Sequence, residues 1–206
     1  MFFIRQSLEI IKPLTSEFGS VNSFASSMST QMENSNPMFS AAATASSSSS
    51  PPLKESYDVF LSFRGDDTRN NITGFLRDAL REKGFDTFFD DDKLERGKEI
   101  SQELLKAIED SKCSVVVLSE NYATSSWCLT ELAKIVECKG TSSGKILPIF
   151  YHVDPGHVRK QEGSYGEALK KHEEDAKHNS QMVQSWRDAL KVIGSLAGWH
   201  VTKDTS

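Results

Sequence analysis

The stretch that decides the fold is YDVFLSFRGDDTR, which runs from Tyr57 to Arg69. Its first seven residues are rich in β-branched and aromatic side chains, a composition typical of a β-strand. A polar segment with a glycine follows and is expected to form a loop. Apolar residues at helical spacing then begin at Ile72, with Asn71 as the expected N-cap and Gly84 as the expected residue after the helix. The sequence therefore predicts a strand, a loop and a helix in succession.

The same alternation continues to the end of the chain. Further strands are expected at 85–89, 114–118 and 146–151, and further helices around 100–108, 129–136, 165–177 and 182–196. Strands separated by helices of this length form parallel sheets with right-handed crossovers and helices on both faces. We therefore expect an α/β fold, a doubly wound parallel β-sheet of about five strands. Ligands in such folds bind at the carboxyl ends of the strands.

The composition divides the chain into three segments. Residues 1–56 contain a run of five serines at 46–50 followed by two prolines, and this segment is expected to be a disordered leader. Its bases are Arg5, Lys12 and Lys54, and it also contains four glutamates, a pattern that disfavours an organelle transit peptide. Residues 57–199 are expected to form the folded domain and residues 200–206 a flexible tail.

The charge and the cysteines limit the classes of function. The net charge of -5 disfavours nucleic acid and acidic membranes as partners. No apolar run reaches the roughly 18 residues that a membrane span needs. The spacing of the three cysteines matches no zinc or haem pattern, so no metal site is predicted and a reducing compartment is favoured. The expected location is the cytoplasm, with the nucleus as an alternative.

Two common nucleotide-binding motifs do not fit this sequence. No G-x-G-x-x-G follows the first strand, so binding of a dinucleotide in the usual Rossmann manner is not predicted. The segment GTSSGK at 140–145 resembles a phosphate-binding loop, but it is one residue short and a strand follows it instead of a helix. We interpret it as a turn.

Trp127 and Glu131 form the most informative pair in the chain. They lie four residues apart, so their side chains share one face of the predicted helix. This face lies off the apolar stripe that contains Leu129 and Leu132. One interpretation is a tryptophan packed on a neighbouring loop beside an exposed glutamate. The other is a site for a planar cationic ligand, in which the ring stacks on a pyridinium and the carboxylate stabilises a positive charge on a ribose carbon.

The loop after the first strand is a second candidate region. Gly65 permits an unusual backbone angle or a close approach by a ligand. Arg64 and Arg69 have the side chain that binds phosphate in a bidentate manner. The alternative is a network of arginine and aspartate side chains that fixes the loop.

Three segments resemble the motifs of plant TIR (Toll/interleukin-1 receptor) domains from intracellular immune receptors. They are YDVFLSFRGDDTR at 57–69, ENYATSSWCLTEL at 120–132 and PIFYHVDP at 148–155, and the resemblance extends from Ser56 to Trp199. It implies a flavodoxin-like fold. It also implies NAD+ nucleosidase activity, because many members cleave the nicotinamide–ribose bond with NAD+ as substrate and without a cofactor. Whether NAD+ or NADP+ is preferred stays open.

The resemblance assigns roles to individual residues. Glu131 corresponds to the essential catalytic glutamate. The expected substrate-binding residues are Phe63, Arg64, Gly65, Asp66, Asp67, Gly97 and Trp127. Of these, Gly97 belongs to the segment 91–99, which matches a mobile loop that helps to form a site shared between protomers in active assemblies.

The family also implies partners, namely further copies of the chain, other TIR domains and TIR-containing immune receptors. Many plant members have Ser-His at a self-association surface of the first helix, where this chain has Gly74-Phe75. The family typically continues into a nucleotide-binding switch and leucine-rich repeats, so a TIR-only protein or a truncated product is expected. Two hypotheses follow: an NAD+-cleaving enzyme of plant innate immune signalling, and a non-catalytic adaptor that binds other TIR domains.

Overall fold

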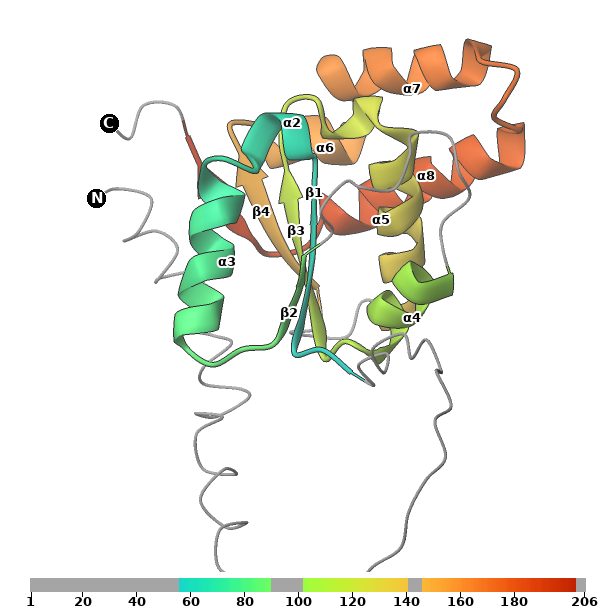
Figure 1. The fold of residues 1–206 in the computed structure, drawn as a ribbon. Helices are drawn as coiled ribbons and strands as arrows, with labels where there is room; N and C mark the ends of the chain where they lie inside the picture. Colours follow the sequence, from blue (N-terminus) through green and yellow to red (C-terminus); the bar gives the residue numbers. More distant parts are fainter. Residues whose placement is uncertain (1–55, 90–101, 141–145, 203–206) are drawn as a thin grey trace, which may run out of the picture.

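Figure 1 shows the computed structural model of the chain, which describes residues 56–89, 102–140 and 146–202. These residues form, in order, β1 (Val59–Phe63), α2 (Gly65–Thr68), α3 (Ile72–Glu82), β2 (Thr87–Phe89), α4 (Gln102–Asp110), β3 (Cys113–Leu118), the 3-10 helix η2 (Tyr122–Thr124), α5 (Ser126–Lys139), β4 (Ile146–Tyr151), α6 (Pro155–Lys160), α7 (Ser164–Glu174), α8 (Ser180–Ile193) and β5 (Trp199–Val201).

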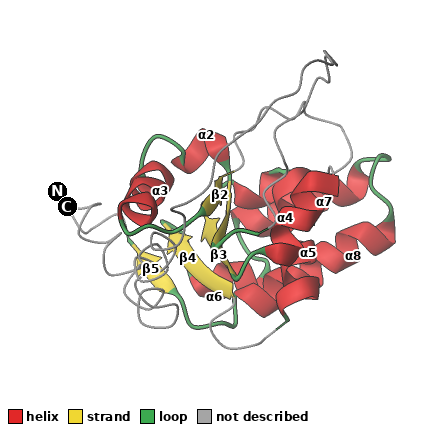
Figure 2. Cartoon of the chain, turned by 60° about the horizontal axis from the view of Figure 1, so that its bottom comes forward, coloured by secondary structure: helices red, strands yellow, loops and turns green. Residues whose placement is uncertain are grey.

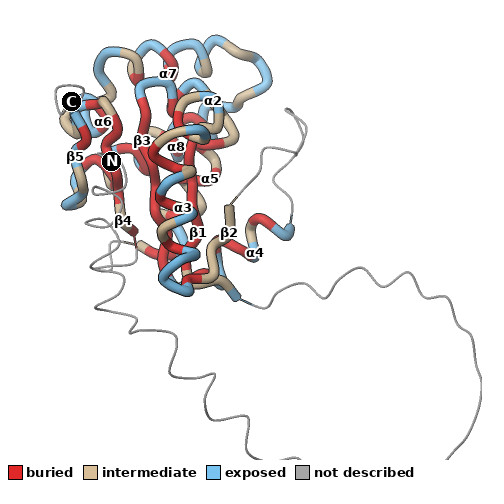
Figure 3. The backbone as a smooth tube through the Cα atoms, turned by 60° about the vertical axis from the view of Figure 1, so that its left-hand side comes forward, coloured by how far each residue is buried: buried red, intermediate tan, exposed pale blue. Residues whose placement is uncertain are grey.

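The strands form one parallel sheet in the order β2-β1-β3-β4-β5. This is the strand order of flavodoxin-like folds, so the expected fold class is confirmed. β1 and β3 lie at the centre and every one of their residues is buried (Figure 3). Such strands read as nearly continuous apolar runs because helices cover both faces of the sheet.

Helices cover the two faces of the sheet unequally (Figure 2). On one face α3 packs against the sheet through Ile72, Leu76 and Leu80. On the other face α4, α5 and α8 form the larger part of the core. Successive side chains of a strand point to opposite faces, so Phe60 and Ser62 of β1 point towards α5 while their neighbours point towards α3. This alternation brings one buried hydroxyl group of β1 to the α5 side.

Both predicted ends of α3 are confirmed. The Asn71 side chain accepts a hydrogen bond from the backbone N–H of Ile72 at 2.6 Å. Gly84, just beyond the helix, has a φ of 84°, a left-handed conformation that suits glycine at the end of a helix.

The end of the domain differs from the expectation. Residues 200–206 were expected to form a flexible tail, but the structure places His200 and Val201 in β5, where Val201 pairs with Tyr151 and is 2% exposed. β5 has three residues. So short a strand shows no periodic pattern in the sequence. It is recognised only by its hydrogen-bonded pairing with the edge of β4.

Some expectations lie outside the described residues. They are the leader at 1–55, most of the GTSSGK turn, and the segment with Gly97. Within the described ranges, no helix is both long enough and apolar enough to cross a membrane.

Candidate active site

The Glu131 carboxyl group lies between β1 and α5. Ser125 caps α5 by accepting a hydrogen bond from the Cys128 backbone N–H at 3.3 Å, and this places Glu131 in the second turn of the helix. Its Oε2 accepts a hydrogen bond from Ser62 Oγ at 2.8 Å, and its Oε1 accepts one from Trp127 Nε1 at 2.5 Å. Glu131 is 3% exposed. The carboxyl group is thus held from both sides near the carboxyl end of β1.

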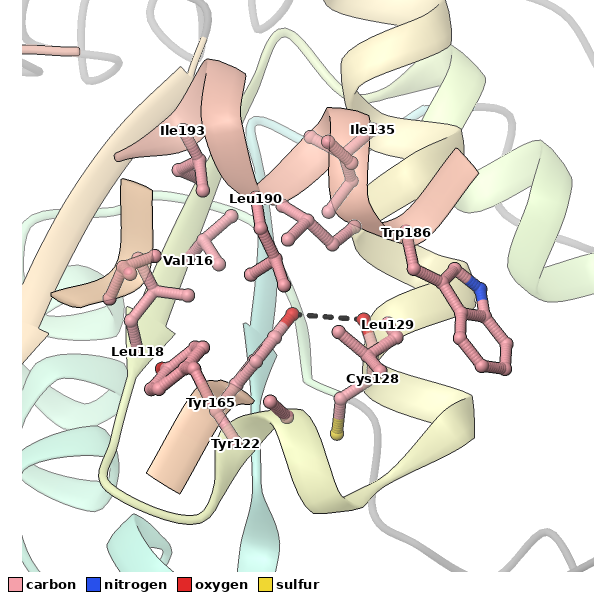
Figure 4. Close-up of a cluster of buried hydrophobic side chains, with 14 of the residues drawn as sticks. Val116, Leu118, Tyr122, Cys128, Leu129, Ile135, Tyr165, Trp186, Leu190 and Ile193 are labelled. Carbon is pink, nitrogen blue, oxygen red and sulfur yellow. Dashed lines mark hydrogen bonds between the residues drawn. The ribbon is translucent and has the colours of Figure 1, made fainter. Parts of the chain in front are cut away.

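A second hydroxyl group extends this arrangement. Tyr122 of η2 lies beneath the start of α5, with its Oη 3.0 Å from Ser62 Oγ. The same hydroxyl donates a hydrogen bond to the Cys128 backbone carbonyl at 3.0 Å (Figure 4). Burial raises the pKa of Tyr122 well above its usual value, and the nearby Cys128 and Glu131 raise it further. The phenol is therefore neutral and remains a hydrogen-bond donor.

The predicted pairing of Trp127 with Glu131 is confirmed, but the interpretation in which the glutamate is exposed is wrong. The helical spacing placed both residues off the core stripe, whereas Glu131 is buried and Trp127 packs half-buried against the core. The reason is that α5 is covered on several sides, since α4, α8 and η2 contact it as well as the sheet. The spacing of apolar residues identifies one buried face of a helix. It does not reveal a second face that neighbouring helices bury.

The segment after β1, Arg64 with the short helix α2, forms a separate network. Arg64 Nη2 lies 3.3 Å from Asp66 Oδ2, and Arg64 Nε lies 3.6 Å from Asp67 Oδ1. Arg64 Nη1 also donates a hydrogen bond to Thr124 Oγ1 of η2 at 3.1 Å. The structure therefore agrees with the alternative in which arginine and aspartate side chains form a network that fixes this segment.

Asp67 ties this loop to the end of β3. Its Oδ2 accepts hydrogen bonds from Ser119 Oγ at 2.6 Å and from the Asn121 backbone N–H at 3.2 Å. Because β1 and β3 are neighbours, the two loops at their carboxyl ends lie side by side, and one carboxylate spans them.

The remaining residues expected at the site are dispersed. The Phe63 ring lies in the core on the α3 face, tilted against Phe89 with their centroids 4.7 Å apart. Gly65 begins α2. Gly97 lies outside the described residues. Among the expected side chains, the structure thus brings Trp127 to Glu131, groups Arg64 with Asp66 and Asp67, and places the Phe63 ring on the opposite face of the sheet.

The sequence interpretation did not assign roles to Ser62 and Tyr122, which complete the surroundings of Glu131. A signal for Ser62 was present, because it is one polar residue within the apolar run VFLSF and is 1% exposed. Buried hydroxyl groups nearly always have a hydrogen-bond partner, so such a serine indicates a polar group across the core. Tyr122 carried no comparable signal, since η2 has three residues and no recognisable pattern.

Comparison with known proteins identifies the family to which the chain belongs. The TIR domain family matches residues 56–206. Disease resistance protein RPV1 of Vitis rotundifolia is 54% identical over 163 residues, which is 79% of this chain and 11% of that protein. TMV resistance protein N of Nicotiana glutinosa is 53% identical over 151 residues, which is 73% of this chain and 13% of that protein. The chain thus spans a small part of the length of these relatives.

A solved structure supports the same assignment. The TIR domains of the activated Roq1 resistosome superpose with a TM-score of 0.64 at 48% identity, over 73% of this chain and 90% of that chain. Fold, motifs and relatives agree, and the chain belongs to the TIR domain family found in plant disease resistance proteins.

Proposed function

We propose that this chain is an NAD+ nucleosidase that acts in plant innate immune signalling through self-association. The observation that carries the proposal is the Glu131 carboxyl group, held by Trp127 and Ser62 near the carboxyl end of β1 in a chain of the TIR family. Ligand sites of doubly wound sheets lie at this edge.

The reaction requires few catalytic groups from the protein. Nicotinamide leaves NAD+ as a neutral molecule because the precursor is already cationic, so its departure needs no general acid. The transition state resembles an oxocarbenium ion, as in glycoside hydrolysis. One carboxylate stabilises this positive charge and orients the ribose hydroxyl groups, and water completes the hydrolysis. Glu131 is the residue that we assign to this role.

The burial of Glu131 links activity to assembly. A carboxyl group that is 3% exposed meets a dinucleotide only after a change that uncovers it. We propose that self-association supplies this change, so that the isolated chain is nearly inactive and the assembled chain is active. The relative in the activated Roq1 resistosome carries its TIR domains in an assembly.

The test is nicotinamide release by concentrated purified protein under conditions shown to oligomerise it. Glu131→Gln should reduce release by at least about 100-fold, the loss usual for one electrostatic group of a catalytic site. Glu137→Gln is the matched control, because Glu137 lies on the same helix with its side chain 72% exposed. Equal turnover in wild type and Glu131→Gln would refute the assignment.

The burial of Glu131 also favours a second candidate, a non-catalytic adaptor that binds other TIR domains. The same assay separates the two. An oligomeric wild-type protein whose nicotinamide release equals that of buffer is the result expected for the adaptor.

A further inference from the structure

Two buried serines of the central strands point to the α5 side of the sheet. Ser62 lies near the carboxyl end of β1 and Ser114 near the amino end of β3. They alternate with Phe60 and Val116, which belong to the core on that side. Ser62 is 1% exposed and Ser114 is 0% exposed. A hydroxyl group at such a position lowers stability unless it has a hydrogen-bond partner, so each serine requires an explanation.

The two hydroxyl groups differ in what they contact. Within the described residues, Ser114 Oγ has no hydrogen-bond partner. Ser62 Oγ donates to Glu131 Oε2 at 2.8 Å and lies 3.0 Å from Tyr122 Oη. Tyr122 in turn donates to the Cys128 carbonyl of α5 at 3.0 Å (Figure 4). The position of the Ser62 hydroxyl group is therefore fixed from two sides, between the glutamate and the tyrosine.

The two carboxyl oxygens of Glu131 are held from different depths of the domain. Oε2 meets the Ser62 hydroxyl group, which belongs to the core of the sheet. Oε1 accepts a hydrogen bond from Trp127 Nε1 at 2.5 Å, and this tryptophan is only half-buried. A ligand that displaces the indole ring would therefore meet Oε1, while Ser62 continues to hold Oε2.

The hydrogen bond from Ser62 limits how the glutamate side chain can rotate. A glutamate has a long, flexible side chain, and a catalytic carboxylate is effective only in the orientation that faces the reacting carbon. The hydroxyl group of Ser62 is carried by a central strand of the sheet, which is a rigid support. Without this donor the carboxyl group would be free to adopt other orientations.

We propose that Ser62 is a positioning residue, which anchors Glu131 Oε2 and so presents Oε1 to the ribose of the substrate. Ser62 itself does not touch the substrate, because it lies on the core side of the carboxyl group. The consequence for catalysis rests on the proposed nucleosidase activity, whereas the orientation of the carboxyl group does not. The two parts are therefore tested by different measurements.

The orientation is tested by NMR of the indole N–H groups in the nitrogen-15-labelled full chain. The Trp127 signal is the one that is missing from Trp127→Phe. In Ser62→Ala the carboxyl group turns away from the indole for part of the time, so the Trp127 proton signal should move upfield as its hydrogen bond weakens. The Trp186 indole donates to Thr130 Oγ1 at 3.2 Å, so its signal is an internal reference and should stay in place. Ser114→Ala is the matched control and should leave both signals unchanged.

The consequence for catalysis is tested by nicotinamide release from the oligomerised protein. Ser62→Ala should lower kcat by about 10- to 100-fold and change KM by less than about 2-fold, because orientation of the carboxylate matters in the transition state. Ser114→Ala should keep both constants. Ser62→Thr retains the hydroxyl group in a residue that suits a strand, and it should recover most of kcat. A role for Ser62 in packing alone would lower thermal stability without this separation of kcat from KM.

The outcomes separate this proposal from the proposed function. A Trp127 signal that is unchanged or moves downfield in Ser62→Ala overturns the positioning role, and so does an unchanged kcat in a wild-type protein that releases nicotinamide. An upfield shift in a protein that releases no nicotinamide upholds the orientation by Ser62 and removes the enzyme. If Ser62→Ala fails to fold, Ser62→Cys decides by the same measurements, because a thiol fills the space and is a weak donor.

Discussion

Asp67 and Ser119 join the carboxyl ends of β1 and β3 through a hydrogen bond of 2.6 Å. The same aspartate accepts from the Asn121 backbone and lies beside Arg64, so it connects the two segments that follow β1 and β3 at the carboxyl edge of the sheet. This carboxylate therefore holds the two segments together whether or not it touches a ligand.

Asp67→Asn should destabilise the domain. The substitution replaces a charge-assisted acceptor by an amide and weakens the bonds from Ser119 and Asn121, so the free energy of unfolding should fall by about 1–3 kcal/mol. Urea denaturation measures this loss. Asp66→Asn is the control, because the Asp66 side chain is 57% exposed and surface ion pairs contribute about 0–1 kcal/mol. Equal losses in the two variants would contradict the bridging role of Asp67.

Gly74→Ala should also destabilise the fold, although alanine favours helices. A Cβ atom at position 74 would lie 2.6 Å from the Arg69 carbonyl oxygen, a backbone atom that cannot move alone. We expect a loss of about 1–3 kcal/mol in the free energy of unfolding, as for other overpacked sites. The exposed Asp78→Ala on the same helix should stay within about 0.5 kcal/mol of wild type.

This glycine occupies the first position of the Gly74-Phe75 pair that stands where many plant members have Ser-His. A serine at 74 would carry the same Cβ atom towards the Arg69 carbonyl oxygen. Unchanged stability of Gly74→Ala would show that the turn at 69–71 shifts easily and that the contact does not select glycine.

His172 should make the domain less stable in acid. Its ring lies edge-on to Trp186 with centroids 5.3 Å apart, and its Nε2 lies 3.0 Å from the Ala123 carbonyl oxygen of η2. Burial lowers the pKa of His172, and the nearby His178 lowers it further. Between the unfolded value of about 6.5 and the lower folded value, the unfolded chain binds more protons, so stability falls as the pH falls through this window.

The measurement is the free energy of unfolding in urea at a series of pH values from about 7.5 to 5, a range that includes the ordinary histidine value. His172→Gln should show a weaker fall of stability in acid than wild type. His157→Gln changes an exposed histidine of α6 and should keep the wild-type pH dependence. Identical pH dependence in all three proteins would exclude a contribution from His172.

Lys139→Met should reveal a contact between the end of α5 and the end of α4. Lys139 is 7% exposed, and its Nζ donates to the backbone carbonyls of Glu109, at 3.1 Å, and Ser111. A cation at the carboxyl end of a helix is favourable, and methionine preserves much of the volume without the donor. We expect a loss of about 1–3 kcal/mol by chemical denaturation, since buried carbonyls are left unsatisfied.

Lys134→Met is the control for this change. Lys134 lies on the same helix and also reaches α4, but it does so through a surface ion pair of 3.0 Å with the Glu109 side chain. Such pairs contribute about 0–1 kcal/mol. A loss at Lys139 no larger than at Lys134 would mean that water replaces its hydrogen bonds without cost.

Local patterns in the sequence predicted most of the fold. The continuous apolar runs of β1 and β3 indicated strands that are buried on both faces. The spacing of Ile72, Leu76 and Leu80 indicated a helix with one buried face. Short elements such as η2 and β5 have three residues each and leave no period. They were found only in the structure.

What the sequence determined by itself is the parallel α/β fold and the pairing of Trp127 with Glu131, since strand and helix periods and the spacing of four residues on a helix are local properties. Tertiary structure alone decided that Glu131 is buried, that its carboxyl group meets Ser62, and that Tyr122 lies behind Ser62. The physical reason is sequence separation: Ser62 and Glu131 are 69 residues apart, and their contact depends on how β1 and α5 pack together in the finished core.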